Sequence, residues 1–170
     1  MTLAPLHLIE GPVGAGKSTY AKSLARGGNA VHIALDEWFA ALFSPDRPGQ
    51  DIIPWYIERK DRLIDLIWSH GKRLLDGGCG VVLELGLIQQ AARMDFLDRV
   101  QGEGYDFTVH VLDAPLALRR ERVRQRNLQQ GATFSMVVPD HIFELASSQW
   151  QPPDDDECAR FRIEFVGAGG

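Results

Sequence analysis

Apolar and polar residues alternate along this chain in short and long blocks. Five short apolar blocks, rich in β-branched residues, have the length of buried strands. They span residues 6–10, 31–35, 80–85, 106–112 and 161–166. Helical patterns lie between most of these blocks. This alternation predicts an α/β fold, with a five-stranded, mostly parallel sheet and helices on both of its faces.

The longest helical pattern occupies residues 54–75, where apolar residues recur along one face. A pair of glycines at 77–78 ends it. A loop containing proline, aspartate and glycine precedes it at 44–49, and two more loops are expected at 129–135 and 151–156. These loops divide the chain between the predicted strands and helices.

The most specific signal is the octapeptide Gly-Pro-Val-Gly-Ala-Gly-Lys-Ser at residues 11–18, which matches the phosphate-binding pattern G-x-x-x-x-G-K-[ST]. A strand signal precedes it and helix-forming residues follow it, which is the context that the motif requires. The predicted nucleotide contacts are Gly11, Pro12, Val13, Gly14, Ala15, Gly16, Lys17, Ser18 and Thr19.

The chemistry of such a loop explains its residue types. Glycine adopts backbone conformations closed to residues with a Cβ, so successive amide N–H groups can turn inward around an anion. The following helix adds the partial positive charge of its N-terminus. Lys17 can place its charge between the β- and γ-phosphates, and Ser18 can ligate Mg²⁺. We therefore expect a nucleoside triphosphate, ATP or GTP, to bind together with Mg²⁺.

Length, charge and cysteine usage narrow the class of protein. One domain over residues 1–170 is expected at this length. The 18 basic and 23 acidic residues give a net charge of −5, which argues against nucleic acid as a partner and suits a small neutral or cationic one. Cys79 and Cys158 lack the spacing of a disulfide framework or zinc site. No apolar run approaches the ~20 residues of a membrane span, so we expect a cytoplasmic protein; its oligomeric state does not follow from the sequence.

Asp36 follows the predicted strand 31–35 directly. Ligands of open α/β sheets bind outside the carboxyl ends of the strands, so a carboxylate at this position is well placed for catalysis. It can accept the proton of a hydroxyl group that attacks the γ-phosphate. The alternative is a structural role as a helix N-cap, since a helical pattern begins at Glu37. Both roles remain open on sequence alone.

Glu84 ends another hydrophobic strand, in the context of a Walker-B-type acid that holds Mg²⁺. Aspartate is the usual acid in that role, and the extra methylene of glutamate changes the distance to the metal. A buried glutamate satisfied by backbone donors is the alternative. Asp36 and Glu84 can also exchange tasks.

Several arginines follow the fourth predicted strand. Arg119, Arg122 and Arg126 share one helix face through their spacings of three and four residues. Guanidinium groups suit a phosphate chain and the charge that develops during phosphoryl transfer, which makes these residues catalytic candidates. Arg120 and Arg124 are expected to point elsewhere. An ordinary solvated basic face is the alternative for all of them.

Weaker candidates lie in the middle of the chain. Arg59, Arg62 and Arg93 either meet an acceptor or phosphate or are surface charges. Trp38 and Tyr56 either stack on an acceptor ring or belong to the core. The pattern of residues does not decide between these alternatives.

Taken in order, these motifs resemble those of small P-loop kinases. That group includes chloramphenicol phosphotransferase, the zeta toxins, polynucleotide kinase and predicted kinases labelled AAA-family ATP-binding proteins. The landmarks are residues 11–18, 35–38, 56–62, 82–86, and 112–115 leading to 122–127, so the resemblance covers nearly the whole chain. It implies the P-loop NTPase fold of the nucleotide-kinase type, with ATP and Mg²⁺ as cofactors.

The resemblance also implies roles for individual segments. Asp36 matches the aspartate that serves as base in members that phosphorylate hydroxyl groups. Residues 119–135 resemble the arginine-rich lid that closes over ATP, and residues 149–153 resemble the loop near adenine. The acceptor-binding region, 36–75, matches no characterised pocket. The implied activity is transfer of the γ-phosphate of ATP to a hydroxyl of a small molecule, such as an antibiotic, a nucleoside or a sugar.

Two other functions are compatible with the sequence. A nucleotide-dependent ATPase switch or binding module would turn over ATP without a hydroxyl acceptor and would expose a large apolar surface. A polynucleotide end kinase would bind oligonucleotides in a salt-dependent way, although the acidic net charge argues against it. A GTPase switch is disfavoured because the chain has no Asn-Lys-x-Asp sequence to read guanine.

Overall fold

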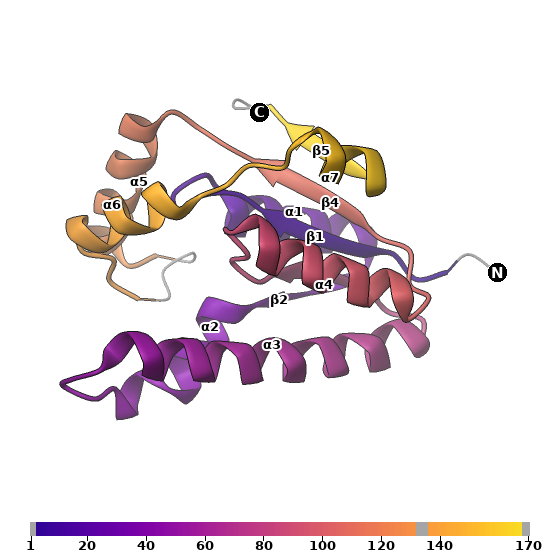
Figure 1. The fold of residues 1–170 in the computed structure, drawn as a ribbon, viewed down its shortest axis with the longest axis horizontal. Helices are drawn as coiled ribbons and strands as arrows, with labels where there is room; N and C mark the ends of the chain where they lie inside the picture. The colour runs from indigo at the N-terminus through magenta and orange to yellow at the C-terminus, as the bar shows by residue number, and fades with distance from the viewer. Residues whose placement is uncertain (1–2, 132–135, 168–170) are drawn as a thin grey trace.

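A five-stranded sheet forms the centre of the computed structural model, which describes residues 3–131 and 136–167 (Figure 1). Its strands lie in the order β2-β3-β1-β4-β5, and each pairs in parallel with its neighbours. The prediction of an α/β fold is confirmed, and the sheet is parallel throughout. The strands are β1 (Leu6–Glu10), β2 (Ala30–Ala34), β3 (Gly80–Glu84), β4 (Thr108–Leu112) and β5 (Ile163–Val166).

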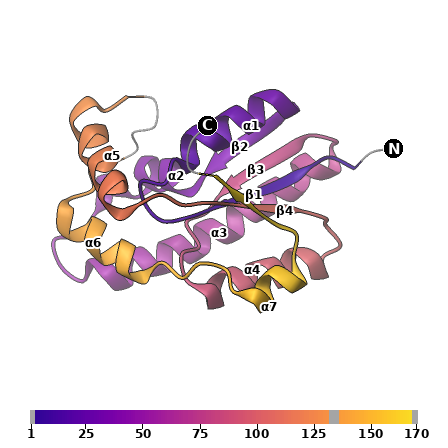
Figure 2. The same cartoon turned by 90° about the horizontal axis from the view of Figure 1, so that it is seen from above.

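Helices cover both faces of this sheet, with α1 on one side and α3, α4 and α7 on the other (Figure 2). In the described parts of the chain, no helix is both long enough and apolar enough to cross a bilayer. The helices are α1 (Lys17–Gly28), α2 (Leu35–Leu42), α3 (Ile52–Asp76), α4 (Gln90–Gly102), α5 (Leu116–Gln129), α6 (Asp140–Gln149) and α7 (Asp155–Arg160), with a 3₁₀ turn at Ser44–Asp46.

The two faces of the sheet are packed differently. Between the sheet and α1, small side chains such as Ala21 and Ala25 lie against Ile9, so the helix that follows the phosphate loop can lie close to the strands. The larger core on the other side includes Ile67 and Trp68 of α3, both fully buried. Strand side chains alternate between these two cores, as the two-residue period of a strand requires.

The predicted loop 151–156 is wrong in its second half, where α7 begins. Asp154 is the N-cap of this helix, and its side chain accepts a hydrogen bond of 2.9 Å from the backbone N–H of Glu157. The acidic residues that follow lie in the first turn, where the helix dipole favours negative charge. The acidic run is therefore a helix start. Of the predicted loop 129–135, residues 132–135 lie outside the described part of the chain.

The carboxyl ends of the central strands meet at one edge of the sheet. Glu10 ends β1 immediately before the glycine loop, while Ala34 of β2 lies in register with Glu84 of β3. Helix α2 starts directly after β2, which brings Asp36 to the same edge. Residues from three separate parts of the sequence thereby come together around the start of α1.

Candidate active site

The phosphate loop connects β1 to α1 in a conformation that requires glycine. Gly11, Gly14 and Gly16 have φ angles of 151°, 80° and 94°. A Cβ on Gly11 would lie 2.2 Å from the carbonyl oxygen of Leu112, and one on Gly14 would lie 2.6 Å from that of Arg119. These separations are too short for any side chain, so the loop is fixed between the end of β4 and helix α5.

Lys17 folds back over this loop. Its Nζ donates hydrogen bonds to the carbonyl oxygens of Gly11 at 2.7 Å and Pro12 at 2.9 Å. Burial lowers the pKa of Lys17, although nearby acids, of which Glu84 and Asp36 have the largest effects, oppose this shift. Lys17 is the first residue of α1, so its ammonium group lies near the N-terminus of that helix, where the helix dipole also favours an anion.

Ser18, Glu84 and His32 form a hydrogen-bonded group beside the loop. The hydroxyl of Ser18 donates to both carboxylate oxygens of Glu84, at 3.1 and 2.9 Å. Nε2 of His32 lies 3.1 Å from one of these oxygens. Burial by itself would raise the pKa of Glu84, but the hydrogen bond from His32, the charge of Lys17 and the bond from Ser18 lower it overall. Glu84 is therefore ionised at neutral pH.

The two predicted metal ligands, Ser18 and Glu84, fit Mg²⁺. Both offer hard oxygen atoms within a few ångströms of each other. Mg²⁺ takes one or two protein oxygens and completes its shell with water and substrate phosphates. Accordingly, this pair would hold the ion without a larger cluster, and in residues 3–131 and 136–167 no group of three or more His, Cys, Asp or Glu side chains is arranged to bind a metal.

Asp36 lies in the first turn of α2, and its charge, like that of Glu84, acts on Lys17. The N-cap of this helix is Ala34, so the alternative of a capping role for Asp36 is wrong. Asp36 is exposed as a residue. Burial around its carboxyl group and the charge of Glu84 raise its pKa, against Lys17 and Arg126, which lower it. Because the pKa of Asp36 is raised overall, its carboxylate takes up a proton more readily than that of a free aspartate.

Aromatic side chains lie next to Asp36. The ring of Tyr56 is 4.9 Å from that of Phe39, which in turn contacts Trp55 at 5.6 Å. Burial, and after it the charge of Asp36, raise the pKa of Tyr56. Trp38 is half-buried against the same core. Of the two residues predicted to stack on an acceptor, Tyr56 lies close enough to Asp36 for the charge of that residue to affect its pKa.

Arg119 joins three elements. Its guanidinium is buried and donates to the carbonyl oxygen of Ala114 at 3.0 Å, to that of Val13 at 3.1 Å and to the hydroxyl of Ser147 at 3.1 Å. Burial lowers its pKa. Arg119 thus holds the phosphate loop, α5 and α6 together, and its hydrogen-bond donors are largely occupied by protein oxygens.

The other two predicted catalytic arginines face the loop with fewer partners. Nη1 of Arg122 lies 3.5 Å from the carbonyl oxygen of Gly14, at the limit of a hydrogen bond. Nε of Arg126 is buried and has no hydrogen-bond partner among the described residues. Its charge lowers the pKa of both Asp36 and Lys17. Arg126 therefore has an unused donor and a charge that acts on the two residues on which phosphoryl transfer would depend.

The remaining arginines of α5 point away from the loop, as expected. Arg120 pairs with Glu144 at 2.7 Å, and Arg124 pairs with Asp140 at 2.8 Å. Both partners lie on α6. Helices α5 and α6 are thus tied together along their outer side, while residues 132–135 of the predicted lid lie outside the described chain.

Arg93 is neither a surface charge nor a phosphate ligand, contrary to both expectations. It is fully buried and forms a two-pronged ion pair with Glu157, at 2.5 and 2.9 Å, and it also donates to the carbonyl oxygen of Leu87. This pair joins α4 to α7. Arg59 and Arg62 lie on α3 with partners on the same helix.

Glu10, at the end of β1, was not singled out from the sequence. Its side chain is buried directly before the phosphate loop, and its Oε1 has no hydrogen-bond partner among the described residues. Burial raises its pKa from 4.5 to about 8, although the charges of Arg93 and Lys17 act in the opposite direction. Glu10 is therefore mostly protonated at neutral pH.

This shift predicts a pH dependence of stability that Glu10→Gln removes. Between pH 4.5 and about 8 the folded state keeps the Glu10 proton while the unfolded state has lost it. The free energy of unfolding therefore falls with rising pH, by up to about 1.4 kcal/mol per unit. We expect the glutamine variant to gain stability relative to the wild type as pH rises through this window, measured by urea unfolding. A constant difference between the two proteins would contradict the shift.

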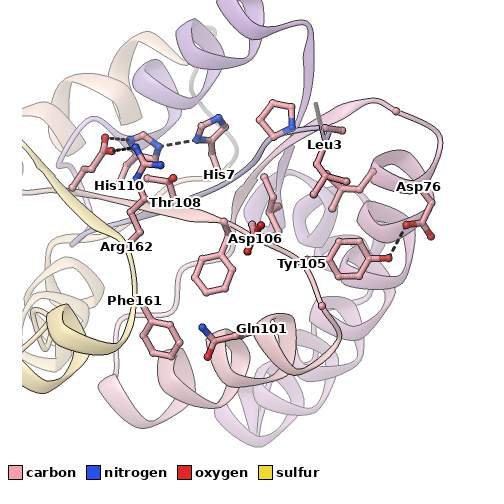
Figure 3. A pocket seen from close by; sticks show the side chains of 18 of the residues that line it. Leu3, His7, Asp76, Gln101, Tyr105, Asp106, Thr108, His110, Phe161 and Arg162 are labelled. Carbon is pink, nitrogen blue, oxygen red and sulfur yellow. Dashed lines mark hydrogen bonds and ion pairs between the residues drawn. The ribbon is translucent and has the colours of Figure 1, made fainter. Parts of the chain in front are cut away.

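A hollow of about 1190 Å³ lies at the opposite edge of the sheet. Figure 3 shows its side chains, which include His7, Thr108, His110 and Arg162. These residues stand at or near the beginnings of their strands, or along the adjoining sheet face, whereas the phosphate loop follows the end of β1. Nδ1 of His7 lies 2.9 Å from Nε2 of His110, so this polar group is satisfied internally. The hollow is separate from the candidate active site.

A parallel sheet of this strand order, with a glycine phosphate loop between β1 and α1 and an acid at the end of β3, defines a P-loop NTPase of the kinase type. More particularly, the chain belongs to the AAA domain family AAA_33, which matches residues 6–153. No curated protein matches the sequence at a significant level. The resemblance to small P-loop kinases is confirmed.

Solved structures share the fold at low sequence identity. A sugar kinase from a Janibacter species has a TM-score of 0.64 and 15% identity, with 96% of this chain and 84% of that chain covered. Chaetomium thermophilum Kti12 in complex with ADP-AlF3 has a TM-score of 0.66 and 16% identity, with 95% and 88% covered. The Pnkp1/Rnl/Hen1 RNA repair complex contains a chain with a TM-score of 0.66 and 21% identity; 95% of this chain but only 47% of that one is covered. At these identities the likeness extends to the fold.

Proposed function

We propose that this protein transfers the γ-phosphate of ATP to a hydroxyl group of a small molecule. The observation that carries the proposal is that two acids which both act on the charge of Lys17 have different partners. Glu84 is engaged by Ser18, a pair suited to Mg²⁺. Asp36 accepts no hydrogen bond from the described residues, while Lys17 and Arg126 both lower its pKa. One acid thus suits the metal and the other remains available to an acceptor.

Each residue has a role in this reaction. The loop amides and Lys17 would hold the phosphates, and Mg²⁺, held by Ser18 and Glu84, would supply charge that neutralises them. The hydroxyl oxygen of the acceptor forms a bond to the γ-phosphorus while the bond from that phosphorus to the ADP oxygen breaks. The hydroxyl proton passes to Asp36. Arg126 stabilises the negative charge that spreads over the transferring group.

Arg122 and Arg119 support the same chemistry in different ways. Arg122 stands at the mouth of the loop, where a small movement would bring its guanidinium to a phosphate oxygen. Arg119 holds the base of α5 against the carbonyl oxygen of Val13. Arg119 is therefore proposed to orient the lid, while Arg122 and Arg126 contact phosphate.

A small acceptor is favoured over a polynucleotide by the net charge of −5, because nucleic-acid binding depends on positive charge along the groove. The sugar kinase of the same fold supports this choice. The chain in the RNA repair complex keeps the polynucleotide alternative open to test. Binding of oligonucleotides that weakens steeply with salt would favour that alternative.

The proposal is tested by incubating the protein with ATP, Mg²⁺ and pooled antibiotics, nucleosides and sugars. Mass spectrometry then searches for compounds that gain a phosphoryl group. We expect such a product with the wild type and not with Asp36→Asn. ATP hydrolysis at equal rates in both proteins, with no modified compound, would contradict the kinase proposal.

That contradictory result would favour a nucleotide-dependent switch. One feature of the lid supports this second candidate, because apolar side chains stand exposed on α5 and α6. Leu128, Ile142 and Leu145 are 80%, 40% and 53% exposed. An exposed apolar surface on a segment that responds to nucleotide is what a switch would offer to a partner.

A further inference from the structure

His32 contacts the metal-side acid from a part of the chain that the sequence motifs do not include. It lies in the middle of β2, an edge strand of the sheet. Its Nε2 is 3.1 Å from Oε1 of Glu84, and the two side chains are only 9% and 10% exposed. Such a contact, formed away from bulk water, is strong enough to orient a carboxylate.

The sheet register explains how the two residues meet. Ala34 of β2 lies opposite Glu84, and His32, two residues earlier, projects from the same face of the strand. That face is covered by α1, whose second residue is Ser18. Glu84 therefore accepts hydrogen bonds from two elements, from Ser18 of α1 and from His32 of β2.

The direction of these hydrogen bonds follows from their chemistry. A carboxylate only accepts, so the Ser18 hydroxyl gives its proton to Glu84 and keeps its oxygen lone pairs for a metal ion. For the same reason Nε2 of His32 carries the proton in this contact. Oε1 thus accepts from both His32 and Ser18, while Oε2 accepts from Ser18.

We propose that His32 is a positioning residue that fixes the Glu84 carboxylate for Mg²⁺. Glutamate has one more rotatable bond than the aspartate usual in this role, and two donors on different elements remove that freedom. Groups of this kind, which bind the ligand rather than the metal, commonly change metal affinity by about 10- to 100-fold when they are removed. The inference rests on the metal site of the proposed function, but it does not depend on the acceptor.

The test measures the affinity of the protein for ADP with and without Mg²⁺ by titration calorimetry. The dissociation constant without Mg²⁺ divided by that with Mg²⁺ reports how strongly metal and nucleotide binding are coupled. We expect His32→Leu to reduce this ratio by about tenfold, with little change in ADP binding without metal. His32→Gln, whose amide nitrogen reaches about as far as Nε2, should restore the ratio. His141→Leu, at an exposed position on α6, is the matched control.

Several outcomes would overturn the role of His32. One is a ratio in His32→Leu equal to that of the wild type. If the leucine variant does not fold, His32→Asn replaces it, because its amide is too short to reach Glu84; equal ratios in the asparagine and glutamine variants would then overturn the proposal. A wild-type protein whose ADP affinity ignores Mg²⁺ would overturn the metal site itself. No acceptor takes part in this titration, so a failed compound screen and a failed role for His32 are separate results.

Discussion

Asp36→Asn is expected to lower the rate of phosphoryl transfer by roughly 10²- to 10⁴-fold, the range over which a positioned general base acts. Asparagine has nearly the same shape as aspartate but cannot take the proton of the attacking hydroxyl. ATP binding should persist, because the proposed phosphate contacts are the loop amides and Lys17 rather than Asp36. Single-turnover transfer to an acceptor from the screen, together with the dissociation constant for ADP, separates these two effects.

Glu37→Gln provides the matched control. Glu37 is the next residue of α2, exposed, and 3.5 Å from Lys22. The substitution Glu37→Gln removes one carboxylate from the same helix turn, as Asp36→Asn does. It therefore reproduces any general electrostatic effect without removing the proposed base. A transfer rate in Asp36→Asn close to that of Glu37→Gln would show that Asp36 is not the base.

Glu157→Gln is expected to lower the free energy of unfolding by about 3–5 kcal/mol, because it leaves the buried guanidinium of Arg93 without its counter-charge. The glutamine keeps the size of the side chain, and the backbone N–H that α7 uses at its cap is unchanged. Urea unfolding at pH 7 measures the loss.

Two further variants make this measurement decisive. The double replacement Arg93→Met with Glu157→Leu removes both charges, and it should recover most of the stability, since apolar pairs often replace buried ion pairs at little cost. Asp140→Asn breaks the exposed pair with Arg124 and should cost far less stability than Glu157→Gln, because water screens an exposed ion pair. A loss in Glu157→Gln as small as that in Asp140→Asn would contradict the importance of the buried pair.

Local motifs explain why much of the site could be predicted. The spacing of Gly11, Lys17 and Ser18 lies within one loop and one helix turn, so it needs no knowledge of the rest of the fold. The three inner strands, β1, β3 and β4, are recognisable because each is an apolar run that is largely buried, whereas the edge strands β2 and β5 are more exposed. Since parallel strands end at one edge of the sheet, Asp36 and Glu84 could also be placed near the loop.

The contacts between buried polar side chains could not be predicted from the sequence, because they depend on which strands and helices are neighbours. His32 and Glu84 are 52 residues apart and meet only because β2 pairs with β3. Arg93 and Glu157 are 64 residues apart, and an arginine on a helix is ordinarily exposed. Glu10 is an acidic residue at the end of a strand, and only the three-dimensional packing around β1 shows that it is buried.

The contact between Arg119 and Val13 restricts how α5 can move relative to the phosphate loop. Because this buried guanidinium bonds the loop, and because Gly14 packs directly on the backbone of α5, the first turn of that helix is anchored to the floor of the nucleotide site. A rigid-body movement of the whole of α5 away from the loop would break this anchor. Arg122 and Arg126 lie beyond the anchored turn on the same helix, so any movement of their guanidinium groups that keeps the anchor requires α5 to bend.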